Sequence, residues 1–231
     1  MTFSIVHLLP ELLGTYGDQG NVEILSWRLK ERSIDHEVIV VHAGDKVPTK
    51  ADLYLLGGGE DDAQIAAAEI LNHGRALAKA HDGGAHFFAV CAGFQLLGST
   101  FPASGERTVE GLGIVAVETI SATPRSVGEL ISTPTIDVPM LTGFENHGGQ
   151  TRFLENLQPL GNVSVGIGNS ESSKVDGVVT DRVVATYMHG PAFARNPELA
   201  DWILARKLGE LAPINAPIFT ALHDERIKNV K

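Results

Sequence analysis

The first half of the chain alternates between short apolar runs and longer amphipathic stretches. Four apolar runs read as buried strands, at residues 3–9, 36–42, 52–56 and 85–90. Segments 21–32 and 60–81 carry apolar residues at helical spacing, with a break expected near His73 and Gly74 in the second, and another helix is expected at 93–98. Strand–helix alternation predicts an α/β fold, in which a mostly parallel sheet is flanked by helices.

The second half is richer in β-like patterns. Between residues 108 and 186 the clearest strands are expected at 114–120, 161–167 and 178–187, and segment 143–149 reads as a glycine-rich loop. A helix is predicted to begin after Asn196 as its cap, with Pro197 in the first turn and Gly209 at its end. We expect one domain over 1–212 and a tail over 213–231 that is partly disordered or docks onto a partner chain.

Charge and composition narrow the classes of function. The 231 residues carry a net charge of −10 without a cluster of basic residues, which disfavours binding to nucleic acid or to an anionic membrane. No stretch approaches the ~20 apolar residues of a membrane span, and residues 1–13 read as a first strand rather than a signal peptide. The single cysteine excludes an intrachain disulfide and fits a reducing cytoplasm.

That cysteine, Cys91, ends an apolar run and directly precedes a predicted helix. This layout is typical of a nucleophile elbow, a tight turn that tolerates only small residues two positions away, here Ala89 and Gly93. The free amides at the start of a helix favour the thiolate, which is the attacking species. A lone buried cysteine is usually only a small apolar residue. Here the turn favours a nucleophile.

Acyl transfer also needs donors for an oxyanion and a general base. The amide of Ala92 and the loop Gly57–Gly59, which ends the neighbouring strand, are the candidate donors. His189 at the end of an apolar run and His147 in its glycine-rich segment both qualify as the base, and their positions do not separate them. The chain has no phosphate-binding loop, and a single cysteine without a close histidine pair argues against a zinc site.

Six motifs resemble those of class I (triad-type) glutamine amidotransferases, in particular the branch shared by cobyric acid synthase and GatD, the glutaminase subunit of lipid II isoglutaminyl synthase. They are Gly-Asp-Gln-Gly-Asn (17–21), Leu-Gly-Gly-Gly-Glu-Asp (56–61), Cys-Ala-Gly-Phe-Gln (91–95), Glu-Gly-Leu-Gly-Ile (110–114), Gly-Phe-Glu-Asn-His-Gly-Gly (143–149) and Tyr-Met-His-Gly-Pro (187–191). Segments 143–149 and 187–191, together with the chain length, point to the GatD-like group. The resemblance implies a flavodoxin-like domain.

The resemblance also implies roles for individual residues. Cys91 is then the nucleophile and His189 the general base, while Gln95, Gly58 and Gly59 help to hold glutamine. Arg125, between the two catalytic motifs, looks equivalent to a substrate-binding arginine of GatD-like proteins; the alternative is a solvated charge on a loop.

One departure concerns the third member of the triad. Many relatives have His-Pro-Glu, in which the acid orients the histidine, whereas this chain has Gly190 and Pro191 after His189. A dyad, or a carboxylate from elsewhere or from a partner chain, remains open.

The implied function is release of ammonia from L-glutamine for a separate, ATP-using MurT-like ligase of the Mur family, which amidates the D-glutamate α-carboxylate of lipid II to D-isoglutamine. No cofactor is expected in this chain, because ATP would bind to the partner. Three alternatives remain: the amidating partner of a corrinoid pathway, a Cys–His peptidase or γ-glutamyl hydrolase that acts alone, and a non-catalytic binding subunit.

Overall fold

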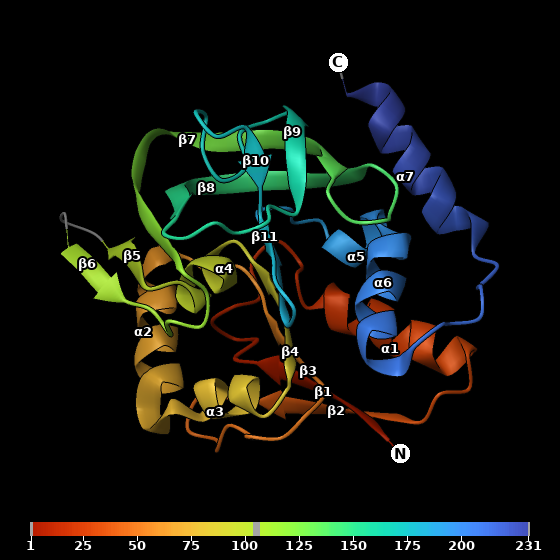
Figure 1. Ribbon diagram of the computed structural model, residues 1–231, viewed down its shortest axis with the longest axis horizontal. Coiled ribbons are helices and arrows are strands. Elements are labelled where there is room, and N and C mark those ends of the chain that lie inside the picture. Colours follow the sequence, from red (N-terminus) through yellow and green to blue (C-terminus); the bar gives the residue numbers. More distant parts are fainter. Residues whose placement is uncertain (1, 104–106, 231) are drawn as a thin grey trace.

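The first of two sheets forms the centre of the protein. The structure is a computed structural model that describes residues 2–103 and 107–230. The central sheet has the strand order β11-β12-β4-β3-β1-β2, and all its pairs are parallel except β11 with β12 (Figure 1). Its strands are β1 Phe3–Leu8, β2 His36–Val41, β3 Leu53–Leu56, β4 His86–Val90, β11 Val178–Val179 and β12 Val183–Thr186. All four strands predicted in the first half are confirmed.

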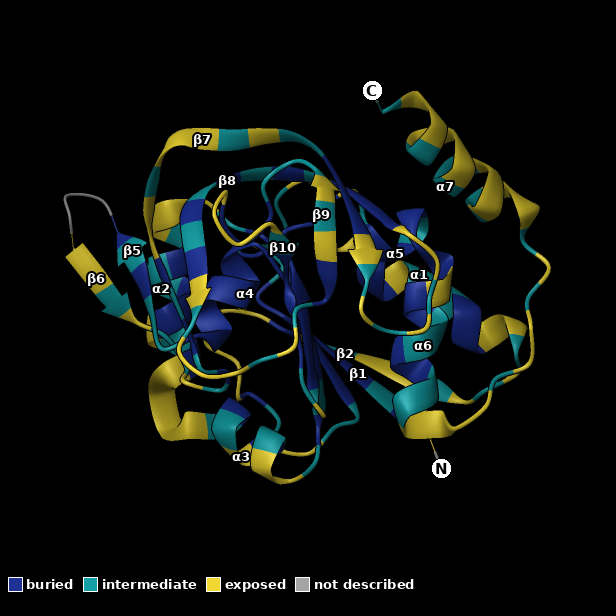
Figure 2. Ribbon diagram, turned by 45° about the horizontal axis from the view of Figure 1, so that its top comes forward, coloured by how far each residue is buried: buried dark blue, intermediate teal, exposed yellow. Residues whose placement is uncertain are grey.

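Helices cover both faces of this sheet, as the alternating pattern predicted. On one side lie α1 (Gly20–Glu31), α5 (Ala192–Arg195) and α6 (Pro197–Leu208), and on the other lie α2 (Asp61–Asn72) and α3 (Ala76–Asp82) (Figures 1 and 2). The predicted break between α2 and α3 is a short 3-10 turn at His73–Arg75, where Gly74 has a positive φ of 70°. Strands β3 and β12 are buried at every position, which explains their continuously apolar sequences.

The second sheet lies across the carboxyl ends of the central strands (Figure 1). It contains β5 Thr100–Ala103, β6 Arg107–Glu110, β7 Val117–Pro134, β8 Leu141–Phe153, β9 Gly161–Val165 and β10 Val175–Asp176. Strands β7 and β8 form a long antiparallel pair, with a register shift between Ser121 and Ser126. Arg125 lies within β7, in the stretch of this register shift, and not on a loop.

The prediction of a loop at 143–149 was wrong, because these residues lie inside β8. Buried and half-buried positions alternate along β8, as in a strand that covers a core with one face. Its glycines mark close packing instead of a turn: a Cβ on Gly143 would overlap the side chain of Met188. The other predicted strands shift in extent, because the run at 114–120 begins as a strand only at Val117 and the run at 178–187 splits into β11 and β12.

The C-terminal segment contains a helix that the sequence pattern did not indicate, α7 (Pro217–Asn229). It stands beside the helices of one face, where the ring of Phe219 packs 5.4 Å from that of Trp27 and His223 Nε2 donates to the Met140 carbonyl at 2.7 Å. The division of the chain at residue 212 stays a prediction. No helix in residues 2–103 and 107–230 is long and apolar enough to cross a membrane.

The helix after Asn196 forms as predicted, but the Asn196 side chain does not cap it. Its Oδ1 accepts from the Thr142 amide and its Nδ2 donates to the Thr142 carbonyl, each at 2.8 Å. The side chain therefore joins α6 to β8.

Candidate active site

Four loops meet at the carboxyl edge of the central sheet. Asp18 follows β1, Gly57–Gly59 follow β3, Cys91 follows β4 and His189 follows β12. These strands are parallel neighbours in the order β12-β4-β3-β1, so their carboxyl ends lie side by side. Ligand sites of open α/β sheets form at this edge.

Cys91 occupies the tight turn that the sequence predicted between β4 and α4 (Ala92–Leu97). Its backbone has φ 52° and ψ −108°, a strained conformation for a residue with a side chain, and its amide donates to the Thr186 carbonyl at 2.9 Å. A Cβ on Gly93 would lie 2.7 Å from Leu56 Cβ, so a small residue is required there. The turn holds the thiol at the end of its strand, 7% exposed.

His189 has the partner that a general base needs. Its Nδ1 lies 2.8 Å from Asp18 Oδ2, and both side chains are almost fully buried. Its Nε2 has no hydrogen-bond partner within the described part of the chain, which leaves that nitrogen to Cys91. Asp18, His189 and Cys91, all from one chain, thus follow one another in the arrangement that a catalytic triad requires.

The surroundings of His189 favour its protonated form. Burial alone lowers the pKa of His189, but the hydrogen bond with Asp18 and the interaction with Cys91 outweigh burial and raise the pKa to about 10. The ring of Tyr16 packs edge-on against the imidazole, with centroids 4.9 Å apart. A proton taken from the thiol would therefore be held stably on the imidazole.

Two glycines of the predicted oxyanion loop, Gly58 and Gly59, have different surroundings. The Gly58 amide donates to Asp18 Oδ2 at 2.8 Å, and a Cβ on Gly58 would lie 2.5 Å from His189 Cε1. Gly58 therefore positions the triad and does not line the cavity beside Cys91. Gly59 and Ala92 do line it. Since Ala92 is the first residue of α4, its amide has no partner inside that helix and can serve as an oxyanion donor.

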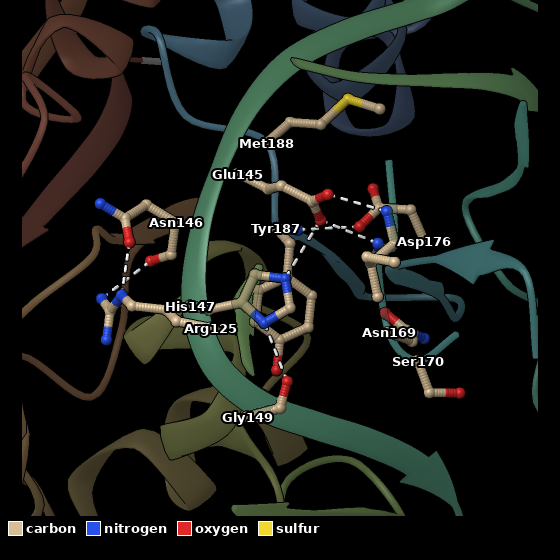
Figure 3. A network of polar contacts seen from close by, with 12 residues as sticks. Arg125, Glu145, Asn146, His147, Gly149, Asn169, Ser170, Asp176, Tyr187 and Met188 are labelled. Atoms are coloured by element: carbon tan, nitrogen blue, oxygen red, sulfur yellow. Dashed lines mark hydrogen bonds and ion pairs between the residues drawn. The ribbon is translucent and has the colours of Figure 1, made fainter. Parts of the chain in front are cut away.

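A cavity of about 250 Å³ opens beside Cys91. Gln95 and Arg125 both line it, as their predicted contact with glutamine requires. The Arg125 guanidinium is held by the side chain and the carbonyl of Asn146, on the neighbouring strand (Figure 3). The Gln95 amide is also fixed, because its Nε2 donates to the Tyr187 hydroxyl at 3.1 Å.

His147, the other candidate base, belongs to the wall of the cavity. Its Nδ1 donates to the Gly149 carbonyl at 2.8 Å and its Nε2 lies 3.1 Å from Glu145 Oε2, so both ring nitrogens are occupied (Figure 3). The imidazole stacks on the ring of Tyr187 at a centroid distance of 3.9 Å. The structure therefore separates the two histidines: only His189 has a free ring nitrogen.

Reasoning from the sequence missed Asp18 as a member of the site. The signal was present, because Asp18 lies in the motif 17–21 that follows the first strand. Nothing in the local pattern, however, shows that this loop turns toward His189. Among the residues that the structure describes, no group of three or more histidine, cysteine or acidic side chains could hold a metal ion.

Comparisons with known proteins agree with this geometry. Residues 4–197 match the CobB/CobQ-like glutamine amidotransferase domain. The chain is 32% identical to the lipid II isoglutaminyl synthase (glutamine-hydrolyzing) subunit GatD of Staphylococcus aureus, covering 88% of this chain and 83% of that protein. It is 33% identical to the corresponding subunit of Streptococcus pneumoniae, covering 85% and 77%. The cobyric acid synthase of Brucella abortus is 30% identical, over 67% of this chain and 32% of that protein.

Solved structures show the same fold at low sequence identity. A crystal structure of a glutamine amidotransferase matches 87% of this chain and 98% of its own, with a TM-score of 0.59 and 16% identity. The glutaminase domain of Trypanosoma brucei CTPS matches 92% of this chain and 96% of its own, with a TM-score of 0.52 and 13% identity. From the matched domain and the GatD relatives together, the chain belongs to the family of CobB/CobQ-like glutamine amidotransferases.

Proposed function

We propose that this chain hydrolyses L-glutamine to L-glutamate and ammonia, as the glutaminase subunit of a two-subunit amidotransferase. The observation that carries the proposal is the placement of Cys91, which lines the cavity and interacts with the histidine of the buried Asp18–His189 pair. A nucleophile, a base and a group that orients the base are the elements of covalent acyl transfer.

The first half of the reaction forms a thioester. His189 Nε2 takes the thiol proton of Cys91, and the thiolate attacks the side-chain carbonyl carbon of glutamine. The amides of Ala92 and Gly59 stabilise the oxyanion, and the imidazolium then donates its proton to the departing ammonia. Asp18 keeps a proton on Nδ1, which directs Nε2 toward the reacting atoms.

The second half restores the enzyme. Water gives a proton to His189 Nε2 as its oxygen attacks the glutamyl thioester carbonyl, and collapse of the tetrahedral intermediate releases glutamate. The imidazolium returns the proton to the Cys91 sulfur. Arg125, which Asn146 holds at the cavity, binds the α-carboxylate of glutamine, and Gln95, which also lines the cavity, supports the substrate.

The relatives support a proposal for the acceptor of ammonia. Two GatD subunits of lipid II isoglutaminyl synthase are 32% and 33% identical over more than four fifths of this chain. We therefore assign delivery of ammonia to a MurT-like, ATP-binding Mur ligase, which amidates the D-glutamate α-carboxylate of lipid II. The partner supplies ATP binding, because carboxylate activation needs ATP and this sequence has no phosphate-binding loop.

The direct test measures ammonia release from L-glutamine by the chain, alone and co-expressed with a MurT-like ligase. Cys91→Ala should abolish release, and the complex with ATP should amidate lipid II. Release that survives Cys91→Ala would overturn the mechanism. Equal hydrolysis with and without the ligase, and no amidation, would favour a hydrolase that acts alone. Amidation of a corrinoid carboxylate instead would favour the function of the cobyric acid synthase branch.

A further inference from the structure

We infer that the first turn of α2 forms a subsite for the α-ammonium group of glutamine, built from the Asp61 carboxylate and the side-chain oxygen of Gln64. This inference rests on the proposed glutaminase function and adds two residues to it. Both residues line the cavity that contains Cys91. They are three positions apart in the helix, so their side chains share one face of α2.

Gln64 has one end fixed and one end free. It is 4% exposed, and its Nε2 donates to Gln95 Oε1 at 2.9 Å and to the Ala92 carbonyl at 3.4 Å. Because the Ala92 carbonyl can only accept, the amide nitrogen must face it. The Gln64 oxygen Oε1 then accepts no hydrogen bond from the described residues. An acceptor without a partner on a side chain that lines a cavity can take a hydrogen bond from a ligand that has donors.

The charges of the cavity fit a zwitterion. Asp61 is the only acid and Arg125 the only Lys or Arg among the residues that line it in the described chain. Asp61 forms no ion pair within the described ranges, whereas Arg125 is already oriented by Asn146. An ammonium group has only donors and so matches the two oxygens of α2, while a carboxylate matches the guanidinium.

This arrangement makes the free amino group a condition for binding. Glutaramate, the glutamine analogue that lacks the α-amino group, retains the carboxylate and the reacting amide but leaves Asp61 and Gln64 without a partner. The subsite therefore selects free L-glutamine over amides of plain dicarboxylic acids. Asp62 offers a matched control, because it is an exposed acid on the same helix that does not line the cavity.

Binding can be measured without catalysis in the Cys91→Ala chain, by calorimetry with L-glutamine and with glutaramate. We expect L-glutamine to bind more tightly. Asp61→Asn should weaken its binding by about threefold to tenfold, a range that allows for the exposure of Asp61, and change glutaramate binding by less than about twofold. Asp62→Asn should leave both affinities unchanged. An equal loss for both ligands, no loss, or no binding of either ligand would overturn the subsite.

A kinetic experiment separates this inference from the function on which it rests. With Cys91 intact, Asp61→Asn should raise KM for L-glutamine by about the same factor and leave kcat nearly unchanged, since the ammonium group is bound equally in ground and transition states. If the Asp61→Asn variant hydrolyses L-glutamine with the same preference over glutaramate as the original chain, the subsite is contradicted and the glutaminase function is not. If the original chain binds L-glutamine more tightly than glutaramate but does not hydrolyse it, the glutaminase function is contradicted and the subsite is not.

Discussion

Asp18 Oδ2 lies 2.8 Å from His189 Nδ1, although 171 positions separate the two residues in the chain. The same oxygen accepts the Gly58 amide at 2.8 Å, so one carboxylate joins the loops that follow β1, β3 and β12. The acid that Gly190 and Pro191 do not provide after His189 is thus present elsewhere in the same chain.

Asp18→Asn should impair catalysis far more than it impairs folding. The amide oxygen can take the place of Oδ2 and still accept from Gly58 and His189, but the negative charge that stabilises the imidazolium during the reaction is lost. We expect kcat for glutamine hydrolysis to fall by about 10²- to 10⁴-fold with KM little changed. Steady-state ammonia release measures this, with thermal melting as the control for folding. A kcat within about tenfold of the unsubstituted chain would show that the charge of Asp18 does not support catalysis.

Cys91→Gly should be at least as stable as Cys91→Ala, although both variants lack the nucleophile. In regular secondary structure, a glycine usually makes the folded protein less stable than an alanine does, by about 0.5–1 kcal/mol. At φ 52° and ψ −108°, however, a residue with a Cβ carries strain of about 1–3 kcal/mol that glycine avoids. Urea unfolding of the two variants gives the comparison. If the glycine variant is clearly the less stable one, the turn is not strained as its dihedral angles indicate.

Gly143→Ala should disturb both stability and activity. Its Cβ would overlap Met188, the residue before His189, and the adjacent Phe144 is paired with His189 by backbone hydrogen bonds of 2.8 and 3.1 Å. We expect a loss of about 1–3 kcal/mol in unfolding free energy, together with lower kcat.

Gly148→Ala is the matched stability control, because the nearest atoms to its Cβ would be 3.8 Å away on the same strand pair. Unfolding free energies from urea titration, measured for both variants, provide the comparison. Equal stabilities would show that the contact between β8 and the His189 segment tolerates a methyl group.

Asp176 should make stability depend on pH in an unusual direction for an acid. Burial raises the pKa of Asp176 to about 6, despite hydrogen bonds from Thr186 and the Tyr187 amide. Between about pH 4 and 6 the folded state keeps a proton that the unfolded chain has released, so this group's contribution to stability is present at low pH and declines as pH rises. A shift of about 2 units corresponds to roughly 3 kcal/mol.

The Asp176→Asn variant removes that titration. The difference in unfolding free energy between the original chain and the variant should therefore change in favour of the variant as pH increases from 4 to 6. Chemical denaturation at several pH values measures the difference. A difference that stays constant across this range would show that Asp176 is ionised in the folded protein at pH 4.

The sequence pattern predicted those features that depend on residues close together in the chain. The buried strands of the first half are continuous apolar runs, and the position of Cys91 between such a run and a helix identified its turn. The β8 strand was misread, because glycines in the 143–149 segment suggest a turn when only the sequence is considered. In the folded protein the absent Cβ of Gly143 makes room for Met188, a contact that no local pattern contains.

Side-chain burial imposes a short-range periodicity, so the α/β order of the first half and the positions of Cys91 and His189 at strand ends can be inferred from the sequence. Only the folded chain shows that His189 has a free ring nitrogen while His147 is held by Glu145, and that Asp18 is the acid beside His189. These arrangements depend on hydrogen bonds between segments that are far apart in the sequence and that the fold brings together. Such contacts leave no spacing in the sequence from which they could be inferred.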